Sequence, residues 1–78
     1  MHMATLTAAI GAAAANHGWV AARPTGLIVS PGRNGYCYRL REDKRYPWTP
    51  NVFDLVADDW QAAPLEQTRA ALASLSDE

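Results

Sequence analysis

Cysteine is nearly absent from this sequence of 78 residues, which holds only Cys37. A single thiol cannot form an internal disulfide. Together with the two histidines, His2 and His17, it also falls short of the four ligands of a structural zinc ion. A domain this short buries only about 60% of the surface that its unfolded chain exposes, so small scaffolds need a further source of stability. With disulfides and zinc set aside, we expect the chain to self-associate.

Long apolar runs are missing as well. The sequence has no stretch of 18 apolar residues, so it predicts no membrane-spanning helix. Its alanine-rich start lacks the basic residues and the strongly apolar core of a secretory signal peptide. With one free thiol and no export signal, we expect a cytoplasmic protein.

Charge of one sign is lacking overall, because the net charge is only −1. General nucleic-acid binding calls for a markedly basic domain, so this class of partner is not expected. The charges are nevertheless segregated: six of the seven basic residues lie between Arg23 and Arg45, and six of the eight acidic residues follow Phe53. The basic middle is either a solvated face or a surface that meets a small anion.

The first half of the sequence predicts one helix followed by three strands. Alanines of high helix propensity predict a helix over 5–16, which ends at Asn16-His17-Gly18. From Trp19 the apolar pattern changes to a period of two, which is typical of strands. Strands are predicted over residues 19–23, 26–30 and 35–42, with a turn over 31–35 between the last two. On the third strand, Tyr36, Tyr38 and Leu40 share one face, and Cys37, Arg39 and Arg41 share the other.

The second half predicts two helices around a small strand. The charged segment 42–46 is predicted as a connection, and Pro47 and Pro50 keep the backbone around Trp48 extended. Thr49 is then the predicted N-cap of a short helix over 50–57. The apolar stripe of that helix consists of Val52, Leu55 and Val56.

Segment 60–62 is predicted as an edge strand, and 64–75 as the last helix. The predicted fold class is α+β, with a small antiparallel sheet, an N-terminal helix, a short helix before the last strand and a C-terminal helix. Residues 1–78 are expected to form a single domain.

Catalytic constellations are not found, and we expect no enzyme, no metal and no cofactor. His17 follows the predicted first helix, where capping accounts for it, and Cys37 is more typical of a small buried apolar residue. The adjacent Asp58 and Asp59 are more readily a helix end than an acid–base pair. The turn over 31–35 joins two predicted strands, whereas phosphate-binding loops precede a helix, so contact of Arg33 or Asn34 with a phosphate is the less favoured reading.

Aromatic recognition chemistry remains. Trp48, held between prolines, favours a rigid wall on which a planar ring stacks, although packing under the sheet is an equal alternative. Asp54 either accepts hydrogen bonds from a base or ribose, or stabilises the helix dipole. Trp60 is more typical of a core or interface anchor.

The segment 48–60 carries these residues in a specific pattern, Trp-Thr-Pro-Asn-Val-Phe-Asp-Leu-Val-Ala-Asp-Asp-Trp. It resembles the Trp-x-Pro-x-x-x-Asp-Leu-x-Ala-x-Asp-Trp signature of the phage Thoeris anti-defence protein two family. Residues 18–23, Gly-Trp-Val-Ala-Ala-Arg, are similar to the opening of that family. The tryptophan expected after the arginine is replaced by Pro24. The resemblance covers about residues 5–62 and leaves the C-terminal helix outside it.

The resemblance implies a molecular sponge. Members of that family bind cyclic ADP-ribose isomers made by a bacterial immune sensor, and some bind cyclic di- or trinucleotides, without cleaving them. They are homo-oligomers, commonly tetramers, with pockets where protomers meet, so a dimer or tetramer in the host bacterial cytoplasm is implied here. By this resemblance Trp48, Asp54 and then Arg23 are candidate ligand residues; Tyr36, Tyr38 and Thr49 are added from the residues alone. The alternative function is a protein-interaction module or inhibitor that uses the same aromatic surface, and a small hydrolase of nucleotide signals is the least favoured.

Overall fold

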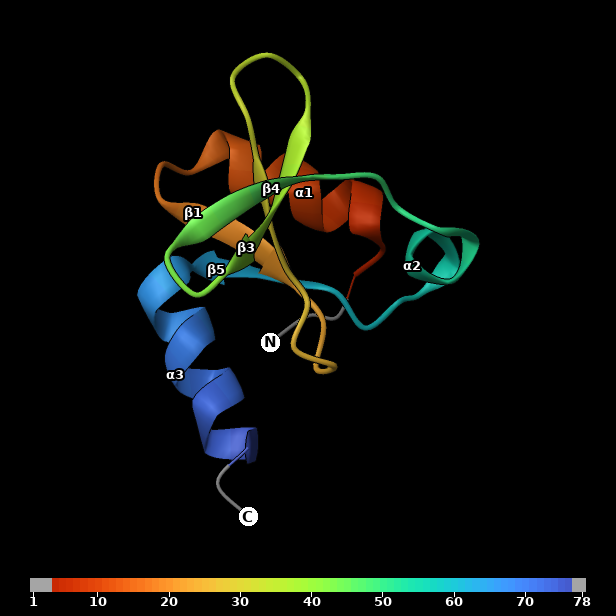
Figure 1. The fold of residues 1–78 in the computed structure, drawn as a ribbon. Coiled ribbons are helices and arrows are strands. Elements are labelled where there is room, and N and C mark those ends of the chain that lie inside the picture. Colours follow the sequence, from red (N-terminus) through yellow and green to blue (C-terminus); the bar gives the residue numbers. More distant parts are fainter. Residues whose placement is uncertain (1–3, 77–78) are drawn as a thin grey trace.

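Three helices and a five-stranded antiparallel sheet make up the computed structural model of the chain, which describes residues 4–76 (Figure 1). The strands lie in the order β4-β3-β2-β1-β5. The predicted α+β class is confirmed, including the short helix before the last strand. The elements in chain order are α1 (Leu6–Ala15), β1 (Trp19–Ala22), β2 (Ile28–Pro31), β3 (Cys37–Arg41), β4 (Lys44–Trp48), α2 (Val52–Val56), β5 (Gln61–Pro64) and α3 (Leu65–Ser76).

Helix α1 covers one face of the sheet. It begins at the N-cap Thr5, whose Oγ1 accepts a hydrogen bond from the backbone N–H of Ala8 at 3.4 Å, and it ends before Gly18, which has a positive φ of 81°. Its buried Ala9 and Ala13 present only methyl groups, which lets the helix backbone approach the strands closely. This face of the core is a cluster of buried residues, namely Leu6, Ala9, Ala21, Val29 and Trp60.

Helix α3 lies against the other face. Val20, Ala22 and Ile28 are buried there, and Leu40, Leu65 and Leu72 pack against them. Successive side chains of a strand point to opposite faces, so the neighbours Val20 and Ala21 of β1 belong to different clusters. The helix begins at Leu65, directly after Pro64 ends β5, and not at Pro64 itself. No helix within residues 4–76 is both long enough and apolar enough to cross a membrane.

The charged segment 42–46 forms most of a strand, so the prediction of a connection there was wrong. Glu42 and Asp43 make a two-residue turn, in which Glu42 has a φ of 57°, and Arg41 pairs with Lys44 across it. The strand lies at the edge of the sheet. An edge strand tolerates exposed charges and a proline because one side of its backbone has no strand partner. Pro47 and the basic residues of β4 are therefore compatible with it.

Helix α2 turns its predicted apolar stripe toward solvent. Its stripe of Val52, Leu55 and Val56 is exposed, and its only buried residue is Asp54. The N-cap is Asn51, whose Oδ1 accepts from the Asp54 N–H at 2.9 Å, so the prediction of Thr49 as N-cap was also wrong. The helix faces this way because Asp54 forms a long-range ion pair, which is described below. In Figure 1 the helix projects from the body of the molecule, on the side away from α3.

Trp60 is the largest fully buried side chain and joins α2 to the core. Its indole Nε1–H donates to the backbone carbonyl of Asp54 at 2.9 Å. A bridge between Trp60 and Ala4 brings the start of the chain alongside. The prediction that Trp60 is a core anchor is confirmed.

The hydrogen bond of Trp60 is tested by Trp60→Phe. This substitution leaves a buried carbonyl without its donor, so we expect the free energy of unfolding in urea to fall by about 1–3 kcal/mol. Trp48→Phe is the matched control, because the half-buried Trp48 indole donates no hydrogen bond within residues 4–76. Equal losses in the two variants would show that only ring volume matters.

Candidate functional site

Arg23, directly after β1, binds two acidic residues from the second half of the chain. Its Nε–H and Nη2–H donate to the two carboxylate oxygens of Asp59 at 2.8 and 3.3 Å. Its Nη1–H donates to Oδ1 of Asp54 at 3.1 Å. The side chains of Arg23 and Asp54 are 19% and 12% exposed, so the ion pair between them is largely shielded from solvent. One guanidinium therefore holds both ends of the 54–59 segment.

The ion pair between Arg23 and Asp59 shifts the pKa of each partner in the direction that favours its charged form. The hydrogen bond from Arg23 lowers the pKa of Asp59, against a smaller opposing effect of burial. The same bond to Asp59 raises the pKa of Arg23, with Asp54 adding to the effect. The forked guanidinium is suited to this role because it binds a carboxylate through two parallel donors and still has a third for the second acid.

The two tryptophans of the 48–60 segment are in contact. The rings of Trp48 and Trp60 meet edge to face, with centroids 6.2 Å apart and planes at 64°. Trp48 is half-buried and packs against the core cluster on the α1 face. Arg23, Asp54, Asp59, Trp60 and Trp48 thus form one connected unit, which we call the Arg23 cluster.

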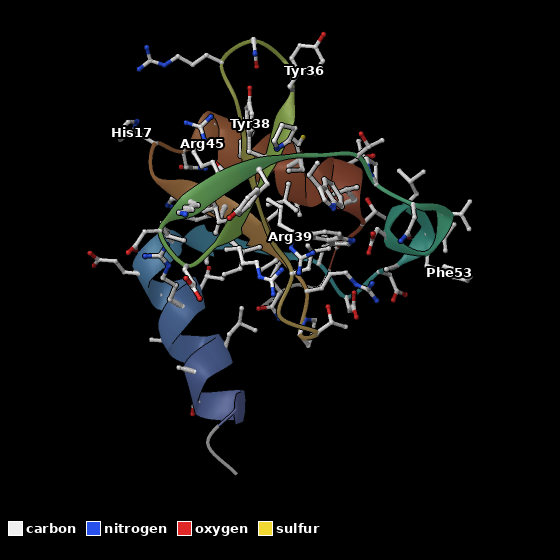
Figure 2. All side chains as sticks on the ribbon, in the orientation of Figure 1. His17, Tyr36, Tyr38, Arg39, Arg45 and Phe53 are labelled. Atoms are coloured by element: carbon white, nitrogen blue, oxygen red, sulfur yellow. The ribbon has the colours of Figure 1, made fainter. Side chains whose placement is uncertain are left out.

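A groove of about 690 Å³ lies elsewhere, between the loop after α1, the turn of the β2–β3 hairpin and the strands β3 and β4. This volume is in the range of small-molecule sites. In it the guanidinium carbon of Arg45 lies 4.3 Å from the centroid of the Tyr38 ring, a cation–π contact. The polar side chains that line it also include His17, Ser30, Arg33 and Asn34. Figure 2 shows His17, Arg45 and Tyr38 on one side of the molecule.

The hairpin turn fixes the Tyr38 ring. Asn34 donates through Nδ2 to the Tyr38 hydroxyl at 3.3 Å, and its Oδ1 accepts from the Tyr36 N–H. Gly32 lies so close that a Cβ there would be 2.6 Å from Cε2 of Tyr38. The glycine is thus needed for close approach, and the predicted turn over 31–35 serves to position an aromatic ring.

The residues predicted from the sequence fall into two places. Arg23 and Asp54 are in direct contact, and Trp48 joins them through Trp60. Tyr38 lies in the groove, whereas Tyr36 and Thr49 are exposed and line neither the groove nor the Arg23 cluster. The structure therefore does not bring the six predicted residues into one site.

Arg45 is the residue of the groove that the sequence reasoning missed. It lies opposite Leu40 in the β3–β4 pairing, and Leu40 is two residues from Tyr38 on the same face of the sheet. Recognising β4 as an edge strand would have placed Arg45 on the Tyr38 face.

The described residues offer few candidates for redox or metal chemistry. Cys37 packs against the core on the α1 face, and burial raises the pKa of its thiol, which disfavours the reactive thiolate. Over residues 4–76, no three side chains of the metal-ligating types come together.

Comparison with protein-family models, with curated proteins and with solved structures found no match to this chain. The resemblance of the 48–60 segment therefore stays a prediction that rests on its residues alone.

The ion pair of Asp59 is tested by pH. A carboxylate whose pKa is lowered by folding stabilises the protein above its unfolded pKa of about 4, and this contribution is lost as the pH falls through the lower folded value. We therefore expect Asp59→Asn to be less stable than the parent chain at pH 7, with the difference in unfolding free energy narrowing below about pH 4.

Asp58→Asn is the control for this measurement, because Asp58 is exposed and forms no ion pair within the described residues. If the unfolding free energies of Asp59→Asn and the parent differ by the same amount from pH 7 to pH 2, the role of Asp59 is contradicted.

Proposed function

We propose that this protein is a non-enzymatic binding domain that holds a nucleotide-like anion in the groove lined by Tyr38 and Arg45. The observation that carries the proposal is the pair of arginines in the groove, Arg33 and Arg45, neither of which has an acidic partner within residues 4–76. Arg23, in contrast, is fully engaged by two acids. Cations without partners in a groove favour an anionic ligand.

The groove chemistry suits a ligand with both a ring and phosphates. A guanidinium stacked on an aromatic ring still has its N–H edge, which binds phosphate oxygens in a forked geometry. Planar bases stack on aromatic and guanidinium faces at about 1–3 kcal/mol per base. Asn34, His17 and Ser30 also line the groove and have side chains that can form hydrogen bonds with such a ligand.

The ligand class comes from the resemblance of the 48–60 segment. We propose a cyclic ADP-ribose isomer or a cyclic oligonucleotide, sequestered without cleavage in the host bacterial cytoplasm as a phage counter-defence. The Arg23 cluster supports the relevance of the signature, because signature residues that are separated in the sequence contact one another or the same arginine. In this proposal Asp54 and Trp48 hold the segment in shape, and Tyr38, Arg45 and Arg33 contact the ligand.

Sequestration without turnover is supported by the placement of the candidate reactive groups. His17 lies at the groove, whereas Cys37 packs against the core on the α1 face. A nucleophile and its base have to be within hydrogen-bond reach of one another. The alternative function, a protein-interaction module, is favoured by the exposed apolar side chains of α2.

The binding proposal is tested by isothermal titration with cyclic ADP-ribose isomers and cyclic dinucleotides. Sequestration requires a sub-micromolar Kd, which corresponds to more than about 8 kcal/mol. We expect Arg45→Ala to weaken binding by roughly 10- to 100-fold, as is typical of a lost charged hydrogen bond.

Arg41→Ala is the matched control, since Arg41 is an exposed arginine of the same hairpin outside the groove. Ligand recovered by heating the complex should be chemically unchanged. No binding at micromolar protein, turnover of the ligand, or equal weakening by both variants would each overturn the proposal.

A further inference from the structure

Helix α2 exposes at least half of each of its four apolar residues. Val52, Phe53, Leu55 and Val56 are 65%, 75%, 50% and 73% exposed. We call these four residues the α2 apolar face. Contiguous apolar patches of roughly 300–600 Å² are the largest on typical monomers and are often functional. The α2 apolar face gathers four exposed large side chains on one short helix.

The orientation of the helix is fixed by contacts on its inner side. Asp54 is bound by Arg23 through its carboxylate and by Trp60 through its backbone carbonyl. Asn51 caps the first turn, and the Ala57 N–H closes the last turn on the carbonyl of Phe53. Rotating α2 to bury its apolar face would break the ion pair, so the exposure belongs to the fold.

Nearly half of the buried apolar side chains are small. Among the described residues, four of the nine buried apolar residues are alanines, namely Ala9, Ala13, Ala21 and Ala22. A domain of this length has little buried area to spare. Placing Phe53 and three branched residues outside is therefore costly unless another surface covers them.

The charge of the face suits contact with a second copy. In a two-fold dimer the same patch meets itself, so any unpaired charge on the patch would oppose its own copy. The acid of α2, Asp54, points inward and is neutralised by Arg23, and the four exposed residues are uncharged. Asp58 lies beyond the helix end, where the polar rim of an interface is expected.

The surface beside the helix can extend such a contact. A standard interface buries about 800 Å² on each partner, more than four side chains supply. The chain enters α2 from the edge strand β4, whose Tyr46 is 45% exposed. In Figure 1 the chain runs directly from β4 along the outside of the molecule to α2, so the edge strand and the helix are neighbours along the chain on this side.

We propose that the α2 apolar face is the contact between two copies of this chain, packed α2 against α2 about a two-fold axis with Phe53 at its centre. The proposal goes beyond ligand binding and does not depend on it. It assigns the surface through which the chain completes its apolar burial.

The test is the mass of the full chain in solution, by size-exclusion chromatography with light scattering over a range of concentrations. The chain is 8.5 kDa, and we expect the parent mass to be an even multiple of this value. Phe53→Ser and Val56→Ser are each expected to halve the mass or to raise the dissociation constant of the assembly at least tenfold. Far-UV circular dichroism should stay unchanged, because both side chains are exposed.

Tyr36→Ser is the matched control, because Tyr36 is 70% exposed and lies well away from Phe53 in Figure 2. It should leave the mass unchanged. A parent chain of 8.5 kDa at every concentration, or an assembly that survives both α2 substitutions, would overturn the proposal. So would a monomer that gains mass only with a different protein. Ligand titration is a separate readout, so a failure of binding with a halved mass for Phe53→Ser would leave the self-contact standing.

Discussion

Arg23 joins two segments that lie far apart in the sequence, and its guanidinium is shared by Asp54 and Asp59. The two acids are 31 and 36 residues away along the chain, so the contact closes the fold over a long distance. Between the two acids the chain leaves α2, and directly after Asp59 come the buried Trp60 and strand β5. A lysine has a single compact charge and cannot span both carboxylates in the same geometry. The positions of α2 and of Trp60 both depend on this forked contact of Arg23 with the two acids, which we call the Arg23 fork.

This bridge divides the molecule into surfaces of different character. Since Asp54 is drawn inward, the apolar residues of α2 are turned outward and form the surface that we propose contacts a second copy. The groove has the reverse character: its arginines have no acidic partners among the described residues, and one of them is stacked on Tyr38. One arginine is thus paired within the chain, and in our proposal the groove arginines bind an anion. In these proposals the 48–60 segment is both scaffold and interface, and the hairpins supply the ligand contacts.

Most elements of the fold could be predicted from local sequence patterns. The alanine run, the period of two after Trp19 and the turn residues 31–35 predicted α1, β1, β2 and β3 because those signals are short-range. Strand β4 escaped prediction because exposed charges at a sheet edge resemble a loop. The apolar stripe of α2 was recognised, but its outward orientation could not be predicted, because it depends on the distant Arg23 that draws Asp54 inward. Arg23 and Asp54 were both selected as site residues, but the sequence does not reveal that they satisfy each other.

The role of the Arg23 fork is tested most directly by hydrogen exchange in Arg23→Gln. The account predicts that the backbone amides of Leu55 and Ala57 and the indole N–H of Trp60 lose protection, while the paired amides of β2 and β3 keep theirs. The fork would then be what holds α2 and Trp60 in place. Protection that is unchanged at α2 and Trp60, or that falls equally throughout the sheet, would contradict this account.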